Sequence, residues 1–296
     1  MKELKSCLWY AINYVRMGIK KILHGIRYRY SCYIECLPYI NWFNILATLY
    51  LNFRSFPFRQ AVRLPVFVYG HPKLFSLYGS MICKGRCYAG MVRFNQTNAN
   101  APSGSGTDSG IANWGQIVFK GRCQIYTANK INVSKGGVLE IGDNTKIMHF
   151  CNISAYNKVS IGDHTWITHR CQVMDTNFHF IADFNRHRVN AIAKPIFIGA
   201  YCWICNSTTV FGGSIIPDRT IVASNSLVNK DMSSIPDSSI VGGIPAKVLS
   251  TSYRRIDNIN LIRMLQSFFK SHPNESYFSL AQDVSNEDCN YTCLLY

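Results

Sequence analysis

A short run in the second half of the chain carries the residues best suited to chemistry. It reads Asp175-Thr176-Asn177-Phe178-His179. Histidine is the usual general base of enzymes, because an imidazole exchanges its proton close to neutral pH. His179 is therefore the candidate base, and Asp175 or Asn177 would orient its imidazole or contact a substrate. The alternative is that His179 only caps a loop through a hydrogen bond to the backbone.

These residues lie where a sequence repeat is interrupted. Large aliphatic residues recur every six positions, with a slip of two residues after Val159 and a gap after Val173. They are Ile141, Ile147, Ile153, Val159, Ile161, Ile167, Val173, Ile198, Ile204, Val210, Ile216, Val222 and Val228. A sustained period of six fits neither an α-helix nor a plainly alternating strand, and it indicates a solenoid. The gap before Ile198 predicts a long excursion from that solenoid, and a loop on a rigid scaffold is where function usually concentrates.

The period of six predicts a triangular parallel β-helix. Each hexad forms a short strand and a corner, and the aliphatic residue points toward the axis. A second inward position lies close to the corner, where only small side chains fit. It holds Cys123, Cys151, Cys171 and Cys202, which we expect to be buried thiols and not disulfides. Cys202 and Cys205 form a single CxxC, and because no second pair stands at zinc spacing, no metal is expected.

Three motifs on this register resemble the hexapeptide-repeat acyltransferases, whose core is a left-handed parallel β-helix. The motifs are KPIFIGAYCWI at 194–204, VASNSLVNKD at 222–231 and GGIPAKV at 242–248. The resemblance covers about residues 117–249. It implies an all-β core of that fold, assembled as a homotrimer. It also implies an acyltransferase that uses acetyl-CoA, with the CoA bound in a groove between neighbouring β-helices.

The resemblance also assigns roles to residues. The catalytic histidine of the family lies in or beside such a loop, which makes His179 the base. The residues expected along the pantetheine arm are Trp203, Cys205, Ser224 and Asn225, and those expected at the CoA phosphates are Lys230 and Lys247. Cys205 stands where the family often has glycine, and Ser224-Asn225 replaces an alanine-glycine pair. These departures predict a narrower groove.

The repeat divides the chain into three parts. We expect a basic helical region at 1–63, the β-helix at 64–249 with its excursion at 174–195, and a C-terminal helix and tail at 250–296. Residues 3–28 carry aliphatic side chains at helical spacing between basic ones, so they predict an amphipathic helix. Such a helix either lies on an anionic membrane surface or packs against the β-helix or a neighbouring subunit.

The formal net charge of +15 suggests anionic partners. Nucleic acid is not expected, since no helix-turn-helix, RNA-recognition or zinc-finger pattern is present. The segment at 1–30 lacks the features of a signal peptide and would make at most a peripheral membrane contact. We therefore expect a cytoplasmic protein, peripheral on the inner face of the membrane. The resemblance to the acyltransferase family, together with the basic N-terminal segment, implies O-acetylation of a sugar hydroxyl in a surface polysaccharide or its lipid-linked precursor.

Two other classes stay open. One is a non-catalytic β-helix used for binding or assembly, against which the presence of His179 argues. The other is the zinc-dependent carbonic anhydrase built on the same solenoid, because His164 and His169 have its spacing of five. Their register disagrees with that class: they follow Ile161 by three and eight positions instead of two and seven. His149 is too close in sequence to be the third ligand.

Overall fold

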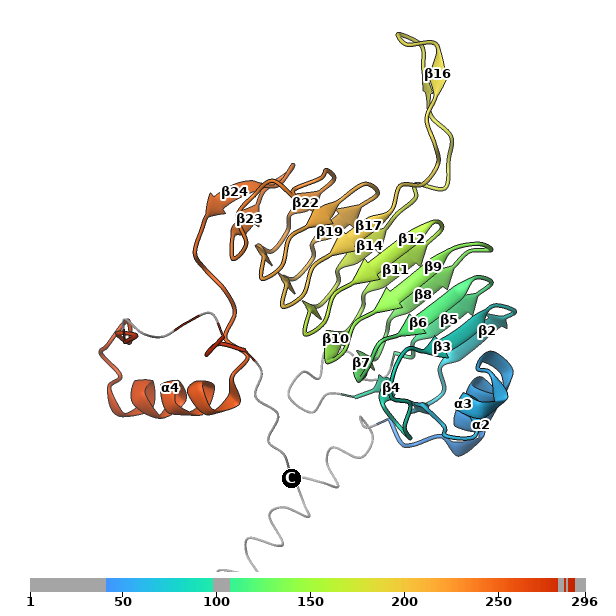
Figure 1. Ribbon diagram of the computed structural model, residues 1–296, viewed down its shortest axis with the longest axis horizontal. Helices are drawn as coiled ribbons and strands as arrows, with labels where there is room; N and C mark the ends of the chain where they lie inside the picture. Colours follow the sequence, from blue (N-terminus) through green and yellow to red (C-terminus); the bar gives the residue numbers. More distant parts are fainter. Residues whose placement is uncertain (1–40, 98–106, 282–284, 286, 291–296) are drawn as a thin grey trace, which may run out of the picture. The chain divides into compact units, whose positions relative to one another are not determined.

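The protein folds as a left-handed parallel β-helix, which confirms the fold class predicted from the hexads. The structure, a computed structural model, describes residues 41–97, 107–281, 285 and 287–290. Every described residue belongs to one compact unit, Asn41–Tyr296. The amphipathic helix predicted at 3–28 lies outside the described residues, and Figure 1 shows the described unit.

Three sheets form the sides of the β-helix. The first sheet contains, in spatial order, β1 (Val66–Val68), β4 (Val92–Gln96), β7 (Cys123–Tyr126), β10 (Thr145–Ile147), β13 (Trp166–Ile167), β18 (Trp203–Ile204), β21 (Ile221–Val222), β23 (Ile240–Gly242) and β24 (Lys247–Ser250). The second sheet contains β2 (Lys73–Leu77), β5 (Gly110–Asn113), β8 (Lys130–Val133), β11 (Asn152–Ala155), β14 (Gln172–Met174), β19 (Thr209–Phe211) and β22 (Leu227–Val228). The third sheet contains β3 (Ser80–Cys83), β6 (Gln116–Phe119), β9 (Val138–Ile141), β12 (Lys158–Ile161), β17 (Ile196–Ile198) and β20 (Ile215–Ile216). Within these sheets every pairing is parallel except that of β23 with β24.

The hexad aliphatic residues stack in columns along the axis. In the third sheet Ile141 pairs with Ile161, and Ile161 pairs with Ile198. Equivalent columns run through the first and second sheets, and every aliphatic residue of the repeat is buried. The slip of two residues is a longer strand: β12 contributes both Val159 and Ile161 to the interior. The predicted inward positions are therefore confirmed.

Small polar residues near the corners tie successive coils together. The Thr165 side chain is fully buried, its hydroxyl donates to the Gly199 carbonyl over 2.7 Å, and it accepts from the Cys202 N–H over 3.1 Å. The four hexad cysteines are buried, and all eight cysteines in the described part of the chain are free thiols. A buried hydroxyl with both bonds made avoids the cost of an unpaired polar group.

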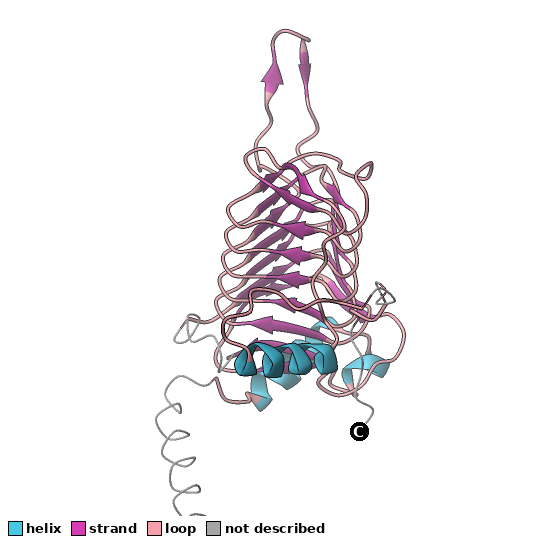
Figure 2. Cartoon of the chain, turned by 90° about the vertical axis from the view of Figure 1, so that its left-hand side faces the viewer, coloured by secondary structure: helices cyan, strands magenta, loops and turns pink. Residues whose placement is uncertain are grey.

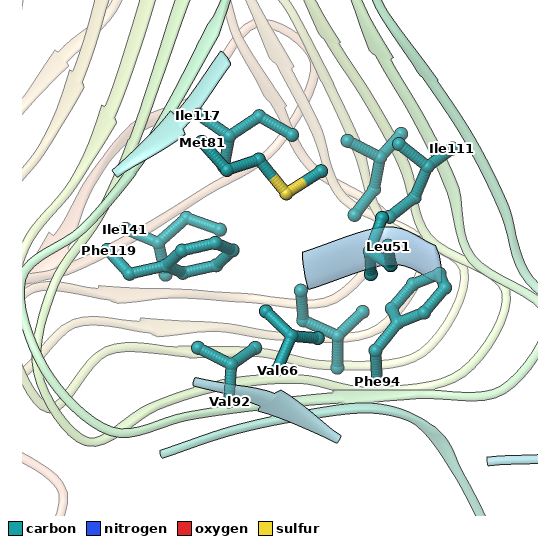
Figure 3. Close-up of a pocket in the computed structure, with 11 residues that line it drawn as sticks. Leu51, Val66, Met81, Val92, Phe94, Ile111, Ile117, Phe119 and Ile141 are labelled. Atoms are coloured by element: carbon teal, nitrogen blue, oxygen red, sulfur yellow. The ribbon is translucent and has the colours of Figure 1, made fainter. Parts of the chain in front are cut away.

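Two helices close the N-terminal end of the β-helix. They are α2 (Ile45–Ser55) and α3 (Phe58–Ala61). Leu51 of α2 enters the interior between the aliphatic side chains of the first coils (Figure 3). Asn52 bonds both backbone groups of Val66, donating over 2.7 Å and accepting over 3.1 Å, and Thr48 accepts from the Val68 N–H. Side chains of α2 thus satisfy the open edge of β1, which would otherwise lack partners.

The C-terminal segment folds back over the outer face of the first sheet. The Arg255 guanidinium lies 4.2 Å from the Trp166 ring centroid, donates to the His164 carbonyl over 2.7 Å, and pairs with Asp257 over 2.6 Å. The helix α4 (Ile259–Ser271) follows, capped by Asn258, and confirms the short C-terminal helix predicted from the sequence. Among the described residues, no helix combines the length and the apolar character that crossing a membrane requires.

Candidate active site

The predicted excursion is a long hairpin that stands clear of the coils between β14 and β17 (Figures 1 and 2). Its strands are β15 (Ala182–Asp183) and β16 (Arg188–Val189), paired antiparallel. The backbone closes at its root, where the Lys194 N–H donates to the Asp175 carbonyl over 2.9 Å. The backbone between β14 and β17 therefore leaves the coil at Asp175 and returns to it at Lys194.

The turn that carries His179 is held by its neighbours. The Thr176 hydroxyl accepts from the Phe178 N–H and donates to the Ile192 carbonyl, both over 3.0 Å. The Asn177 side chain accepts from the His179 N–H over 3.3 Å. The imidazole of His179 is exposed and makes no hydrogen bond to the described residues. The backbone of the loop is thus fixed by Thr176 and Asn177, which leaves the imidazole available.

Asp175 lies below this turn, at the root of the excursion. It is 1% exposed, and its two carboxylate oxygens accept from the N–H groups of Tyr156 and Asn157, each over 2.7 Å. Burial raises the pKa of Asp175, and these backbone donors act in the opposite direction. Asp175 therefore fastens the excursion to the preceding coil, and both its oxygens are engaged there.

The residues predicted along the pantetheine arm gather at one corner, between the first and second sheets. Trp203 lies in β18 and Cys205 follows it; the Cys205 N–H donates to the Val222 carbonyl over 2.9 Å. Ser224 and Asn225 occupy the same corner one coil later, where both are exposed. Cys205 is half-buried, and this burial raises the pKa of its thiol to about 11, so the thiol is protonated at neutral pH.

His179 and Lys230 are not at that corner, whereas Lys247 lies beside it, because its partner Gly242 follows Val241, which pairs with Val222. Lys230 follows β22, and it lies with the root of the excursion at the corner between the second and third sheets. Lys247 lies in β24, beside Gly242. A strand of the second sheet, about 10 Å for three residues, separates the two corners. A single chain therefore does not bring His179 to Cys205.

Sequence analysis missed a cationic hollow on the outer face of the first sheet. Its volume is about 210 Å³, and it is lined by Arg93, Arg122, Gln124, Asn144 and Lys146. Burial, followed by the charge of Arg255, lowers the pKa of Lys146, whose ammonium lies 4.1 Å from the Trp166 ring centroid. The basic residues come from separate coils, so only the strand register, which pairs Arg93 with Gln124 and Gln124 with Lys146, reveals the row.

The histidines weighed as zinc ligands lie at opposite ends of β13. His164 stacks on Tyr201 with ring centroids 4.6 Å apart, and His169 stacks on His149 at 5.4 Å. Within the part of the chain that the structure describes, no three histidine, cysteine or acidic side chains are grouped so as to hold a metal ion. The arrangement offers stacking partners where a zinc site needs converging ligands.

The burial of His149 leads us to expect that the folded protein loses stability in mild acid. His149 is fully buried, its Nδ1 lies 2.7 Å from the Thr127 hydroxyl, and burial, followed by the charge of His169, lowers its pKa to about 4. Above pH ~6.5 both folded and unfolded states hold a neutral imidazole. Between pH ~6.5 and ~4 only the unfolded state binds the proton. As the pH is lowered through this range, the free energy of unfolding therefore falls by about 1.4 kcal/mol per pH unit.

This dependence is measured by urea unfolding at several pH values across that window. The His149→Gln variant is expected to lose this part of the slope. The matched control is His187→Gln, because His187 is exposed on the hairpin. A wild-type slope that survives in His149→Gln would assign the acid sensitivity to other groups.

Comparisons with known proteins found solved structures that are similar to this chain. No protein-family model matches the chain. The polySia-specific acetyltransferase NeuO is 22% identical, over 74% of this chain and 98% of its own, with a TM-score of 0.40. A hexapeptide-repeat acetyltransferase from Vibrio cholerae O1 biovar eltor, solved with acetyl coenzyme A, is 32% identical over 38% of this chain and 60% of its own, with a TM-score of 0.33. The polysialic acid O-acetyltransferase OatWY is 15% identical over 67% and 99%, with a TM-score of 0.37.

The chain is thus similar to hexapeptide-repeat sugar and polysialic acid O-acetyltransferases. This is the same family that the three hexad motifs resemble.

Proposed function

We propose that the protein is a CoA-dependent O-acyltransferase that moves an acetyl group from acetyl-CoA to a sugar hydroxyl, with His179 as the general base. The observation that carries this proposal is the exposure of the His179 imidazole and its lack of hydrogen bonds to the described residues. The imidazole lies on a turn that Thr176 and Asn177 hold in place. A general base needs both a fixed position and a nitrogen free to accept a proton.

The proposed reaction needs no covalent enzyme intermediate, because the thioester is already activated. His179 takes the proton of the acceptor hydroxyl while the hydroxyl oxygen bonds to the thioester carbon. The carbon–sulfur bond then breaks, and the protonated imidazole returns its proton to the sulfur that leaves. The products are an acetylated sugar and CoA with a free thiol, and His179 ends in its starting state.

The cofactor assignments follow from the same resemblance. Trp203, Cys205, Ser224 and Asn225 would flank the pantetheine arm at their shared corner, while Lys230 and Lys247 would contact the CoA phosphates. His179 and Cys205 lie at different corners, separated by a strand of the second sheet. A homotrimer with the groove between neighbouring β-helices would bring the base of one subunit to the thioester on the next.

The acceptor is proposed to be a hydroxyl of a surface glycan or of its lipid-linked precursor, modified in the cytoplasm at the inner face of the membrane. The net charge of +15 supports an anionic environment, and the eight free thiols of the described residues support a reducing compartment. The basic segment at 1–30 would add a peripheral membrane contact. Asp175 is proposed to act through position, by holding the root of the excursion on the coil below.

Acetyl-CoA binding by the purified protein tests the cofactor assignment. Lys230→Ala is expected to raise the Kd for acetyl-CoA about tenfold, since a charged contact to a phosphate contributes about 1.4 kcal/mol or more. Lys135→Ala is the matched control, because Lys135 is an exposed lysine at the same kind of corner on a coil nearer the N-terminus. Isothermal calorimetry measures both.

Absence of acetyl-CoA binding by the wild-type protein would contradict the proposed transferase activity. The β-helix would then be a binding or assembly module. Equal weakening by Lys230→Ala and Lys135→Ala would keep the transferase and remove Lys230 from the phosphate site.

A further inference from the structure

The helix α2 presents its apolar face to solvent. The exposed fractions are Trp42 55%, Ile45 60%, Leu46 77%, Leu49 37%, Tyr50 55%, Phe53 49%, Phe58 73% and Val62 51%, and we call these eight residues the α2–α3 face. The side of α2 that packs on the β-helix carries Thr48, Asn52 and Ser55 beside Leu51. A surface helix of a soluble protein has the opposite arrangement, with its apolar side against the core.

The stretch of sequence that carries the α2–α3 face contains basic residues and no acidic one. Residues 41–97 contain seven basic residues and no acidic one; the basic residues are Arg54, Arg59, Arg63, Lys73, Lys84, Arg86 and Arg93. Arg54 and Arg59 are exposed on the two helices themselves. Long basic side chains beside exposed tryptophan, tyrosine and leucine are typical of segments that lie in the headgroup region of a bilayer.

We propose that the α2–α3 face docks onto an anionic lipid surface. A contiguous apolar patch of this kind is rare on a monomeric soluble protein and marks an interaction site. The apolar side chains would enter the boundary between headgroups and acyl chains, while Arg54 and Arg59 reach back to phosphates. This docking surface does not depend on the proposed acyl transfer.

Charge decides among the possible occupants of this face. A second copy of the chain would bring the exposed Arg54 and Arg59 of both copies to the same contact, with no acidic residue on either helix to oppose them. The preceding segment at 1–40 carries seven basic and two acidic residues, so it would also oppose like charges. Anionic headgroups would neutralise Arg54 and Arg59, and the same bilayer would accept the apolar side chains of the α2–α3 face. The lipid surface is therefore the occupant that both observations favour.

Vesicle co-sedimentation of the full chain tests the proposal. With vesicles of roughly 70% phosphatidylcholine and 30% phosphatidylserine we expect binding that weakens at high salt and with phosphatidylcholine alone. The double variant Leu46→Gln/Phe58→Gln is expected to lower the partition coefficient at least about tenfold, because each apolar side chain contributes a large share of the transfer free energy. Both side chains are exposed, so the fold should be retained, and circular dichroism checks it.

The matched control removes two exposed apolar side chains elsewhere. Leu249→Gln/Tyr277→Gln changes residues that are 63% and 68% exposed and should bind vesicles as the wild type does. Equal binding by wild type and Leu46→Gln/Phe58→Gln would overturn the proposal, and any binding would then belong to residues 1–40. A lower oligomeric mass of Leu46→Gln/Phe58→Gln in light scattering, without vesicle binding by the wild type, would assign the face to contact between copies.

Discussion

His179→Gln is expected to lower kcat for acetyl transfer by about 10²–10⁴-fold and to leave the Kd for acetyl-CoA unchanged. Glutamine keeps the polarity and much of the volume of histidine, but it accepts no proton at neutral pH. The turn should persist, since Thr176 and Asn177 hold it through the backbone of Phe178 and His179. The measurement is the initial rate of CoA thiol release from acetyl-CoA, with water as the acceptor until a sugar is identified.

The control for this prediction lies on the same hairpin. His187 is exposed between Arg186 and Arg188, and His187→Gln should keep kcat within a factor of about three, because most surface substitutions away from a site have small effects. Separate calorimetry of acetyl-CoA binding keeps loss of the base apart from loss of the cofactor. Full turnover by His179→Gln would remove His179 from the reaction and leave the excursion with a binding role.

Asp257→Ala is expected to lower the free energy of unfolding by about 3–5 kcal/mol. The Arg255 and Asp257 side chains are only 8% and 7% exposed, and their charged atoms lie 2.6 Å apart. Burial raises the pKa of Asp257, and the charge of Arg255 opposes that shift. Removal of the carboxylate leaves the Arg255 guanidinium buried against Trp166 without its counter-charge, while its Nε and Nη1 already lack hydrogen-bond partners among the described residues.

A second ion pair in the chain supplies the comparison. Arg219 and Asp237 are 3.1 Å apart, but their side chains are 32% and 56% exposed. Asp237→Ala should therefore cost at most about 1 kcal/mol. Urea unfolding of both variants at pH 7 gives the two values. Similar losses in the two variants would mean that water reaches Arg255 and that the C-terminal segment does not seal the first sheet.

The sequence predicted the β-helix well because each coil repeats the same local environment. Ile161, Ile167 and Val173 face the same axis as their counterparts in the next coil, so one hexad position carries the same physical constraint many times. The slip at Val159 was visible as an irregularity, and the strand β12 explains it by adding a second inward residue. The excursion was visible for the same reason, as the place where the period stops.

Contacts between coils could not be predicted in this way. The row of Arg93, Gln124 and Lys146 depends on strand register across separate turns of the chain. The sequence predicted that Asp175 or Asn177 orients the imidazole of His179. The Asp175 carboxylate instead accepts from the backbone N–H groups of Tyr156 and Asn157 on the coil below. Spacing in sequence identifies a residue that faces outward or inward, but it does not identify which coil supplies its partner.

Which face of the helix α2 is buried could not be predicted from its hydrophobic pattern either. A period of 3.6 predicts two faces, and hydrophobicity alone would have turned the apolar one inward. The open edge of β1 needs hydrogen-bond partners, and Thr48 and Asn52 supply them. The demand of the backbone for partners therefore decides which side of the helix is buried.

The stacked coils also fix the distance along the axis between the end closed by α2 and the root of the excursion. In the second sheet β14 is the fifth strand, counted from β2 at the end closed by α2. Neighbouring strands lie about 4.8 Å apart, so the root of the excursion stands about 19 Å along the axis from the first coil. If the α2–α3 face rests on a bilayer, the β-helix becomes a spacer of fixed length. Under the proposed function, a glycan attached at that surface would then be acetylated only beyond its first sugars, where its chain is long enough to reach His179.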